Sequence, residues 1–142
     1  MFLYEEDLKS SFWDKYKRRK NIKNYAFEVG RKGGVDLVTF ESLSDVFEFN
    51  AFEFKLEDIK KALLQAKHNL EFVHKSWVVI PEEKKNLIQN KYYTEIKSIR
   101  GLGVILVEEK GYYEFFIKPL PRDNKDIRLN DELLKLAAFS KC

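Results

Sequence analysis

The chain has 142 residues, of which 44% are hydrophobic, 15% aromatic and 35% charged, with six glycines and three prolines. This composition predicts one globular domain and excludes collagen-like, low-complexity and disordered chains. Lysine and arginine outnumber aspartate and glutamate by 26 to 23, and the resulting net charge of +3 is too small for nucleic-acid binding through bulk charge alone.

Cysteine use and hydropathy indicate a cytoplasmic protein without a membrane partner. The single cysteine is Cys142, so neither an intrachain disulfide nor a cysteine-based metal site can form. No apolar run approaches the roughly 18 residues of a membrane span, and residues 1–7 lack the basic and apolar regions of a signal peptide. We therefore expect a reducing, cytoplasmic setting.

Hydrophobic periodicity predicts four helices and six strands. Apolar residues three and four apart indicate amphipathic helices, whereas alternating or compact β-prone runs indicate strands. The expected elements are a helix over 3–19, strands over 25–30, 35–40 and 46–55, a helix over 57–73, a strand over 77–80, a helix over 81–99, strands over 104–108 and 112–117, and a helix over 129–139.

This element order predicts an α/β sandwich. Three successive strands form an antiparallel meander, and a helical crossover then adds a parallel strand, which gives a mixed sheet with helices on both faces. A hairpin and a short helix follow near the C-terminus. We expect a core domain over residues 1–121, and a charged linker followed by the last helix over residues 122–142.

Three polar residues stand where strand residues are usually apolar: Asp36 in the second strand, and Glu53 and Lys55 in the third. Glu53 and Lys55 are two residues apart and share a face, and a hairpin can bring Asp36 beside them. Two carboxylates are ligands that Mg²⁺ selects, and a lysine suits phosphate chemistry. The alternative is an exposed edge strand with an ordinary cross-strand salt bridge.

The context of these residues resembles the PD-(D/E)XK nuclease superfamily over roughly residues 3 to 81. The matching features are an initial helix, a three-strand meander, the sequence Gly33-Gly34-Val35-Asp36, the sequence Glu53-Phe54-Lys55, a glutamine ten residues later at Gln65, and the buried strand 77–80. Val35 replaces the proline of the nominal motif, which is its most loosely kept part. The resemblance implies a restriction endonuclease-like core.

The resemblance also implies a metal-dependent hydrolase acting on DNA. Asp36, Glu53 and the carbonyl of Phe54 would hold Mg²⁺ or Mn²⁺, and Lys55 would orient the attacking water. The products would carry a 5′-phosphate and a 3′-hydroxyl. RNA stays open as a substrate, as do a homodimer and a protein partner. Because the chain contains no recognisable base-reading module, we expect structure- or end-directed action, or delivery by a partner, rather than recognition of a long sequence.

Further candidate residues surround this motif. Glu5 falls within the apolar stripe of the first helix, where it resembles an additional metal-site glutamate, and Glu28 on the first strand competes for that role. A frayed helix terminus is the alternative for Glu5. Gln65 could reach a phosphate or Lys55, although a surface glutamine often serves solubility alone. His68 is interpreted as structural.

A run of basic residues ends the first helix. It either contacts the phosphate backbone or forms an ordinary solvated helix terminus. The candidate nucleic-acid-binding residues are Lys15, Lys17, Arg18, Arg19, Lys20 and Lys23, together with Arg31 and Lys32 in the next turn.

Two functions of other classes remain beside the nuclease hypothesis. A catalytically inactive nuclease-like module would bind nucleic acid or a protein. A purely structural subunit would neither cleave nor bind nucleic acid. Divalent-metal titration separates the enzyme from both, and a binding assay at two salt concentrations separates the module from the structural subunit.

Overall fold

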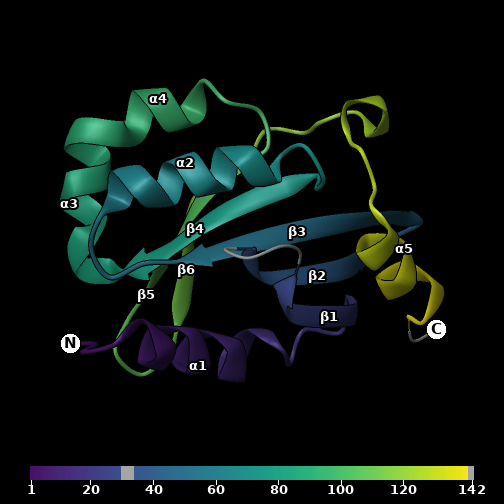
Figure 1. Cartoon of the computed structure of the whole chain (residues 1–142). Helices are drawn as coiled ribbons and strands as arrows, with labels where there is room; N and C mark the ends of the chain where they lie inside the picture. The colour runs from purple at the N-terminus through teal and green to yellow at the C-terminus, as the bar shows by residue number, and fades with distance from the viewer. Residues whose placement is uncertain (30–33, 141–142) are drawn as a thin grey trace.

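Six strands form one mixed sheet in the computed structural model, which describes residues 1–29 and 34–140 (Figure 1). The strands are β1 (Ile22–Val29), β2 (Val35–Leu43), β3 (Val46–Phe54), β4 (Lys75–Pro81), β5 (Leu102–Val107) and β6 (Tyr113–Ile117). Strands β1 to β3 form an antiparallel meander, β3, β4 and β5 run parallel, and β6 returns antiparallel to β5. The mixed sheet predicted from the sequence is confirmed.

Helices cover both faces of this sheet, as predicted (Figure 1). Helix α1 (Glu5–Tyr16) lies on one face, and α2 (Ile59–Asn69) lies on the other. Helix α5 (Asp131–Ala138) packs beside β1 near the C-terminal end of the chain. Within residues 1–29 and 34–140, no helix has the length and apolar character needed to cross a bilayer.

The apolar stripe of α1 packs against one sheet face. Leu8 and Phe12 are fully buried there and Tyr16 is 2% exposed. The Phe12 ring lies 5.8 Å from that of Phe52 and 5.7 Å from that of Phe54, between ring centroids. This stripe is the helical pattern that the spacing of three and four residues predicts.

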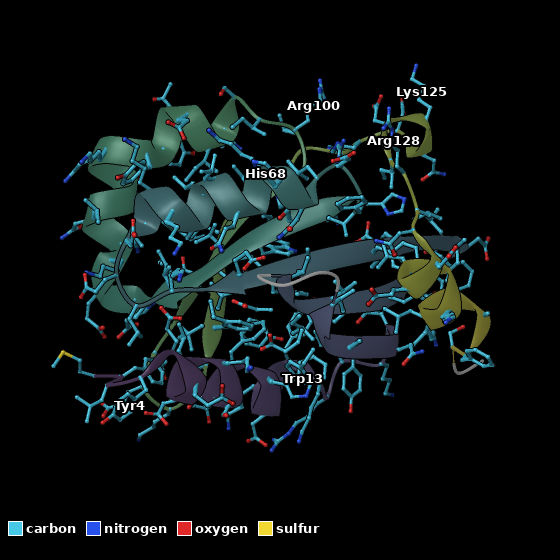
Figure 2. The ribbon with its side chains drawn as sticks, in the orientation of Figure 1. Tyr4, Trp13, His68, Arg100, Lys125 and Arg128 are labelled. Atoms are coloured by element: carbon cyan, nitrogen blue, oxygen red, sulfur yellow. The ribbon has the colours of Figure 1, made fainter. Side chains whose placement is uncertain are left out.

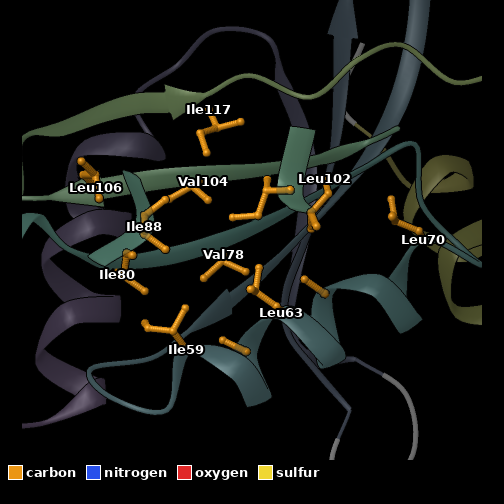
Figure 3. Packing of buried hydrophobic residues seen from close by; sticks show 13 residues of the cluster. Ile59, Leu63, Leu70, Val78, Ile80, Ile88, Leu102, Val104, Leu106 and Ile117 are labelled. Carbon is orange, nitrogen blue, oxygen red and sulfur yellow. The ribbon is translucent and has the colours of Figure 1, made fainter. Parts of the chain in front are cut away.

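The opposite face buries the larger aliphatic cluster, shown in Figure 3. Ile59 and Leu63 from α2 pack there against Val78 and Ile80 from β4, and all four are nearly or fully buried. The side chain of Asp58 begins α2 by accepting a hydrogen bond from the N–H of Lys61 at 3.2 Å.

The helix predicted over residues 81–99 is broken into short pieces. They are η1 (Glu82–Lys84), α3 (Lys85–Leu87), the π-turn η2 (Ile88–Tyr92) and α4 (Tyr93–Lys97). Ile88 and Ile96 are both fully buried in the aliphatic cluster. Residues eight apart are displaced by about 80° around a regular α-helix, whereas the interrupted helix, with its wider π-turn, buries both of these side chains against the sheet.

Predicted strand ends shift by several residues. β1 begins at Ile22 rather than Tyr25, and β2 continues past Phe40 to Leu43. The extension of β2 follows from its pairing with β3, which continues to Leu43 opposite Val46. Backbone pairing therefore outweighs the polar composition of these strand ends.

The segment expected to be a charged linker is tied to the core through Arg122. Its guanidinium Nη1 donates to the carbonyl oxygens of Leu70 at 2.6 Å and Val73 at 2.8 Å. These carbonyls follow the C-terminal end of α2, where backbone acceptors lack helical partners. Further along, Leu133 of α5 is 1% exposed in a cluster with Val38.

We predict that Arg122→Ala lowers the free energy of unfolding by about 1.5–3 kcal/mol, because two buried acceptors lose a charged donor. Chemical denaturation followed by circular dichroism measures this loss. Lys125→Ala is the matched control, because the Lys125 side chain is 79% exposed. Equal stability of the two variants would contradict the role given to Arg122.

Candidate active site

Asp36 and Glu53 meet at one end of the sheet, where β2 begins and β3 ends. Leu37 lies opposite Phe52 in the antiparallel register, so the next residues along, Asp36 and Glu53, lie opposite each other. Their side chains share the face covered by α2, since side chains alternate along a strand. The carboxyl groups are close enough that the charge of Asp36 contributes to raising the pKa of Glu53.

Each carboxyl group is held by a neighbouring donor. The backbone N–H of Phe54 donates to Asp36 Oδ2 at 2.9 Å. Asn69, at the end of α2, donates from Nδ2 to Glu53 Oε2 at 2.7 Å. Glu53 is 3% exposed, so its carboxyl group is removed from bulk water.

Burial and mutual proximity disfavour ionisation of the pair. Desolvation is the main cause that raises the pKa of Glu53 to about 8, with the charge of Asp36 adding to it, while Asn69 and Lys55 act in the opposite direction. Desolvation also raises the pKa of Asp36, against the hydrogen bond from Phe54. Burial therefore favours the protonated, uncharged form of these carboxyl groups.

Lys55 follows β3 directly and lies next to the pair. Its Nζ is 3.7 Å from Oε2 of Glu5, and the Lys55 side chain is 20% exposed. Glu5 opens α1, so this ion pair joins the N-terminal end of α1 to the end of β3. The structure thus brings Glu5, Lys55, Asp36 and Glu53 into one region.

A cavity of about 280 Å³ adjoins Glu53 along α2. Gln65 lines it together with Glu53, and the Gln65 Oε1 atom is buried without a hydrogen-bond partner among the described residues. His68 lines the same cavity from α2 (Figure 2). A buried acceptor without a donor favours a ligand or water that can donate to it.

Glu28, the competitor of Glu5, lies exposed on β1 with a backbone φ of 55°. Its Oε1 atom is 3.9 Å from Nζ of Lys9, and its charge contributes to raising the pKa of Asp36. Lys9, one helical turn after Glu5, acts oppositely on Asp36. The charges of both residues therefore act on Asp36.

Asp36 and Glu53 carry oxygen ligands of the kind that a magnesium-type ion takes. They offer two carboxylates. Phe54, which follows Glu53 in the chain, links them because its backbone N–H donates to Asp36. Among the described residues, no group of three or more histidine, cysteine, aspartate or glutamate side chains is arranged to hold a metal. Mg²⁺ in phosphate-processing sites commonly uses one or two carboxylates, with waters and substrate oxygens as the other ligands.

The basic run lies at the other end of α1. Lys15 follows Glu5 by ten residues, about 15 Å along a helix axis. Lys17 and Arg18 form ion pairs with Asp14.

Three further basic candidates differ in their surroundings. The Arg19 guanidinium stacks over Tyr16 and Phe115, at 5.1 and 5.4 Å from the ring centroids. Lys20 is exposed, and Lys23 is half-buried at the start of β1. The remaining two, Arg31 and Lys32, lie outside the residues that the structure describes.

Sequence reasoning missed Asn69 and Lys9. Asn69 follows Gln65 by four residues and so shares its helix face, which is a weak signal that no motif distinguishes. Lys9 likewise follows Glu5 by four residues and shares its helix face. His68, interpreted as structural from the sequence, lines the same cavity as Glu53.

Comparison with protein-family models gives no match for this chain. The search of curated proteins and the search of solved structures give no match either.

We predict that the contribution of Glu53 to stability falls as the pH rises from about 4.5 to 8, because folded Glu53 keeps a proton that unfolded Glu53 has lost. Glu53→Gln removes this titration and flattens the profile by at least a few degrees of Tm. Thermal unfolding of metal-free protein across this range measures the difference. Glu114→Gln, an exposed substitution on β6, is the control, and parallel wild-type and Glu53→Gln profiles would refute the raised pKa.

Proposed function

We propose that this protein is a divalent-metal-dependent phosphodiester hydrolase acting on DNA, of the PD-(D/E)XK type. The observation that carries the proposal is the pairing of Asp36 with Glu53 at the sheet end, with Lys55 beside them. Keeping two carboxyl groups adjacent and desolvated costs stability, and a cation offsets that cost. Mg²⁺ is the proposed ion, and Mn²⁺ fits the same oxygen ligands.

The order of the elements supports a restriction endonuclease-like fold. Helix α1 precedes the meander, β2 opens with Asp36, β3 ends before Lys55, and α2 leads to the buried parallel strand β4. This is the order that the sequence resemblance implies. The fold assignment is therefore part of the proposal, beyond the mixed sheet itself.

Each residue has a distinct role in this proposal. Asp36 and Glu53 bind the ion, and the donors Phe54 N–H and Asn69 hold their carboxyl groups in place. The bound ion would polarise the phosphate and lower the pKa of the attacking water. Lys55, oriented by Glu5, positions that water and stabilises the charge that develops on phosphate oxygens.

A catalytically inactive module is the second candidate function. Lys55 already pairs with Glu5, and Glu53 already accepts a hydrogen bond from Asn69. Such internal partners also occur in polar clusters whose role is structural. The module would bind nucleic acid or a protein through the same surface without cleaving a substrate.

We predict that Lys55→Ala lowers cleavage by on the order of 10²-fold or more, because a group acting on transition-state charge is lost. Binding of Mg²⁺ and DNA should persist, since Asp36 and Glu53 remain. Single-turnover cleavage of labelled single-stranded, duplex and branched DNA with Mg²⁺ or Mn²⁺ measures the rate. Isothermal titration measures the metal affinity.

Lys75→Ala is the matched control for this experiment. Lys75, like Lys55, pairs with a glutamate, here Glu48 at 3.1 Å, but it lies at the start of β4 with its Cα opposite Asn50 rather than at the end of β3. The cleavage rate of the Lys75→Ala variant should stay near that of the wild type. If wild-type protein binds DNA but cleaves no form with either metal, the inactive module replaces the enzyme.

A further inference from the structure

A cavity of about 570 Å³, here named the α5 cavity, lies between the N-terminal end of α5, the segment after α2, and the place where β1 ends and β2 begins. It is larger than the cavity beside Glu53, and its volume falls within the range of about 300–1,000 Å³ that is typical of small-molecule sites. Apolar side chains and two amides form most of its lining: Val38, Phe72, Val73, Leu133, Asn69 and Asn130.

The α5 cavity lies on the same sheet face as the carboxylate pair. Val38 follows Asp36 by two residues on β2, so the two side chains share that face. Asn69 lines both the α5 cavity and the cavity beside Glu53, and its Nδ2 donates to Glu53 Oε2. A ligand that contacts Asn69 from the α5 cavity therefore lies one hydrogen-bonded residue away from the pair.

The lining of the α5 cavity suits a flat group with apolar faces and polar edges. The ring of Phe72 and the branched side chain of Val73 offer apolar contact. Asn130 Oδ1 accepts from the N–H of Leu133 at 2.9 Å, which leaves Asn130 Nδ2 as a donor without an acceptor among the described residues. A nucleobase matches both features, because its faces stack on aromatic rings and its edge carries hydrogen-bond acceptors.

Charge disfavours the phosphate backbone inside the same cavity. None of the described residues that line it is a lysine or an arginine, whereas Asp131 and Glu132 line it from the first turn of α5. Carboxylates in a first turn already complement the positive end of a helix, so this end is no site for a further anion. A strand that continued through the cavity would bring its phosphates to these carboxylates without a cation. The cavity therefore suits a nucleoside at which the strand ends.

We propose that the α5 cavity binds the terminal nucleoside of a nucleic-acid strand, and that the phosphate next to this nucleoside reaches Asp36 and Glu53. The inference rests on the proposed function and specifies its substrate class as strand ends. The base occupies the apolar part of the cavity beside Phe72, and Asn130 donates to an acceptor on the edge of the base. The rest of the strand leaves on the side of the carboxylate pair, away from α5.

Binding is tested first without metal and without a phosphate. The isotope-labelled full chain is titrated with thymidine in EDTA, and two-dimensional NMR follows the backbone amide signals. Thymidine should shift the signals of Val73 and Leu133, whereas 2-deoxyribose, which lacks a base, should not. Phe72→Ala should weaken thymidine binding by at least about fivefold, because one stacking ring is lost.

Two further variants keep this binding test decisive. Phe116→Ala is the matched control, because Phe116 is also a half-buried phenylalanine packed against a core cluster, but on β6. It should leave thymidine binding unchanged. Asn130→Asp keeps an oxygen that accepts from the N–H of Leu133 but removes the amide donor, so it should weaken thymidine binding even if Phe72→Ala does not fold.

The requirement for a strand end is tested with linear and circular single-stranded DNA of the same length and sequence, in Mg²⁺ or Mn²⁺. The linear strand should yield mononucleotides, and the circular strand should stay intact because it has no terminal nucleoside. Cleavage of the circle as fast as the linear strand would overturn the inference and leave the proposed hydrolase standing.

The remaining outcomes separate the cavity from the proposed enzyme. No response to thymidine, an equal response to 2-deoxyribose, or thymidine binding that is unchanged in both Phe72→Ala and Asn130→Asp would overturn the inference. Thymidine binding that depends on these residues, without cleavage of any strand, would support the nucleoside site and refute the proposed hydrolase.

Discussion

The antiparallel register between β2 and β3 determines which polar groups meet in this protein. Leu37 lies opposite Phe52, and both side chains are fully buried beneath α1. A shift of one residue would turn side chains to the other face, so apolar packing specifies this register strongly. The same register places Asp36 opposite Glu53. Packing on the α1 side of the sheet therefore positions the carboxylate pair on the α2 side.

Local sequence patterns predict most of the helices and strands, whereas the remaining features depend on tertiary packing. The stripe of α1 and the alternation of β3 are visible in the sequence because each buries one face. The break within residues 82–97 is not visible there, because it depends on where Ile88 and Ile96 reach the sheet. Similarly, the motif around Asp36 and Glu53 is visible in the sequence. Asn69 and Lys9 reach the site only when α2 and α1 pack on the sheet, so no local pattern reveals them.

Two buried glutamates illustrate how structural and reactive carboxylates differ. Glu41, on the α1 face, is 3% exposed and accepts hydrogen bonds from two hydroxyl groups and one amide, donated by Tyr16, Thr39 and Asn21. Three donors compensate a carboxylate well for the loss of water. Glu53 is equally buried but accepts from one amide and lies beside a second carboxyl group. Glu53 is therefore the glutamate whose environment a cation would improve.

This unfavourable pair persists because the surrounding backbone has little freedom to relax. Phe54 is 2% exposed and packs under α1, and its N–H holds Asp36. Ala51, two residues before Glu53 on the same face, is fully buried and pairs with Val38. Moving the carboxyl groups apart would disturb both packed faces of the sheet. The packed core thus keeps the two carboxyl groups close together, and the cation of the proposed function would relieve their repulsion without repacking.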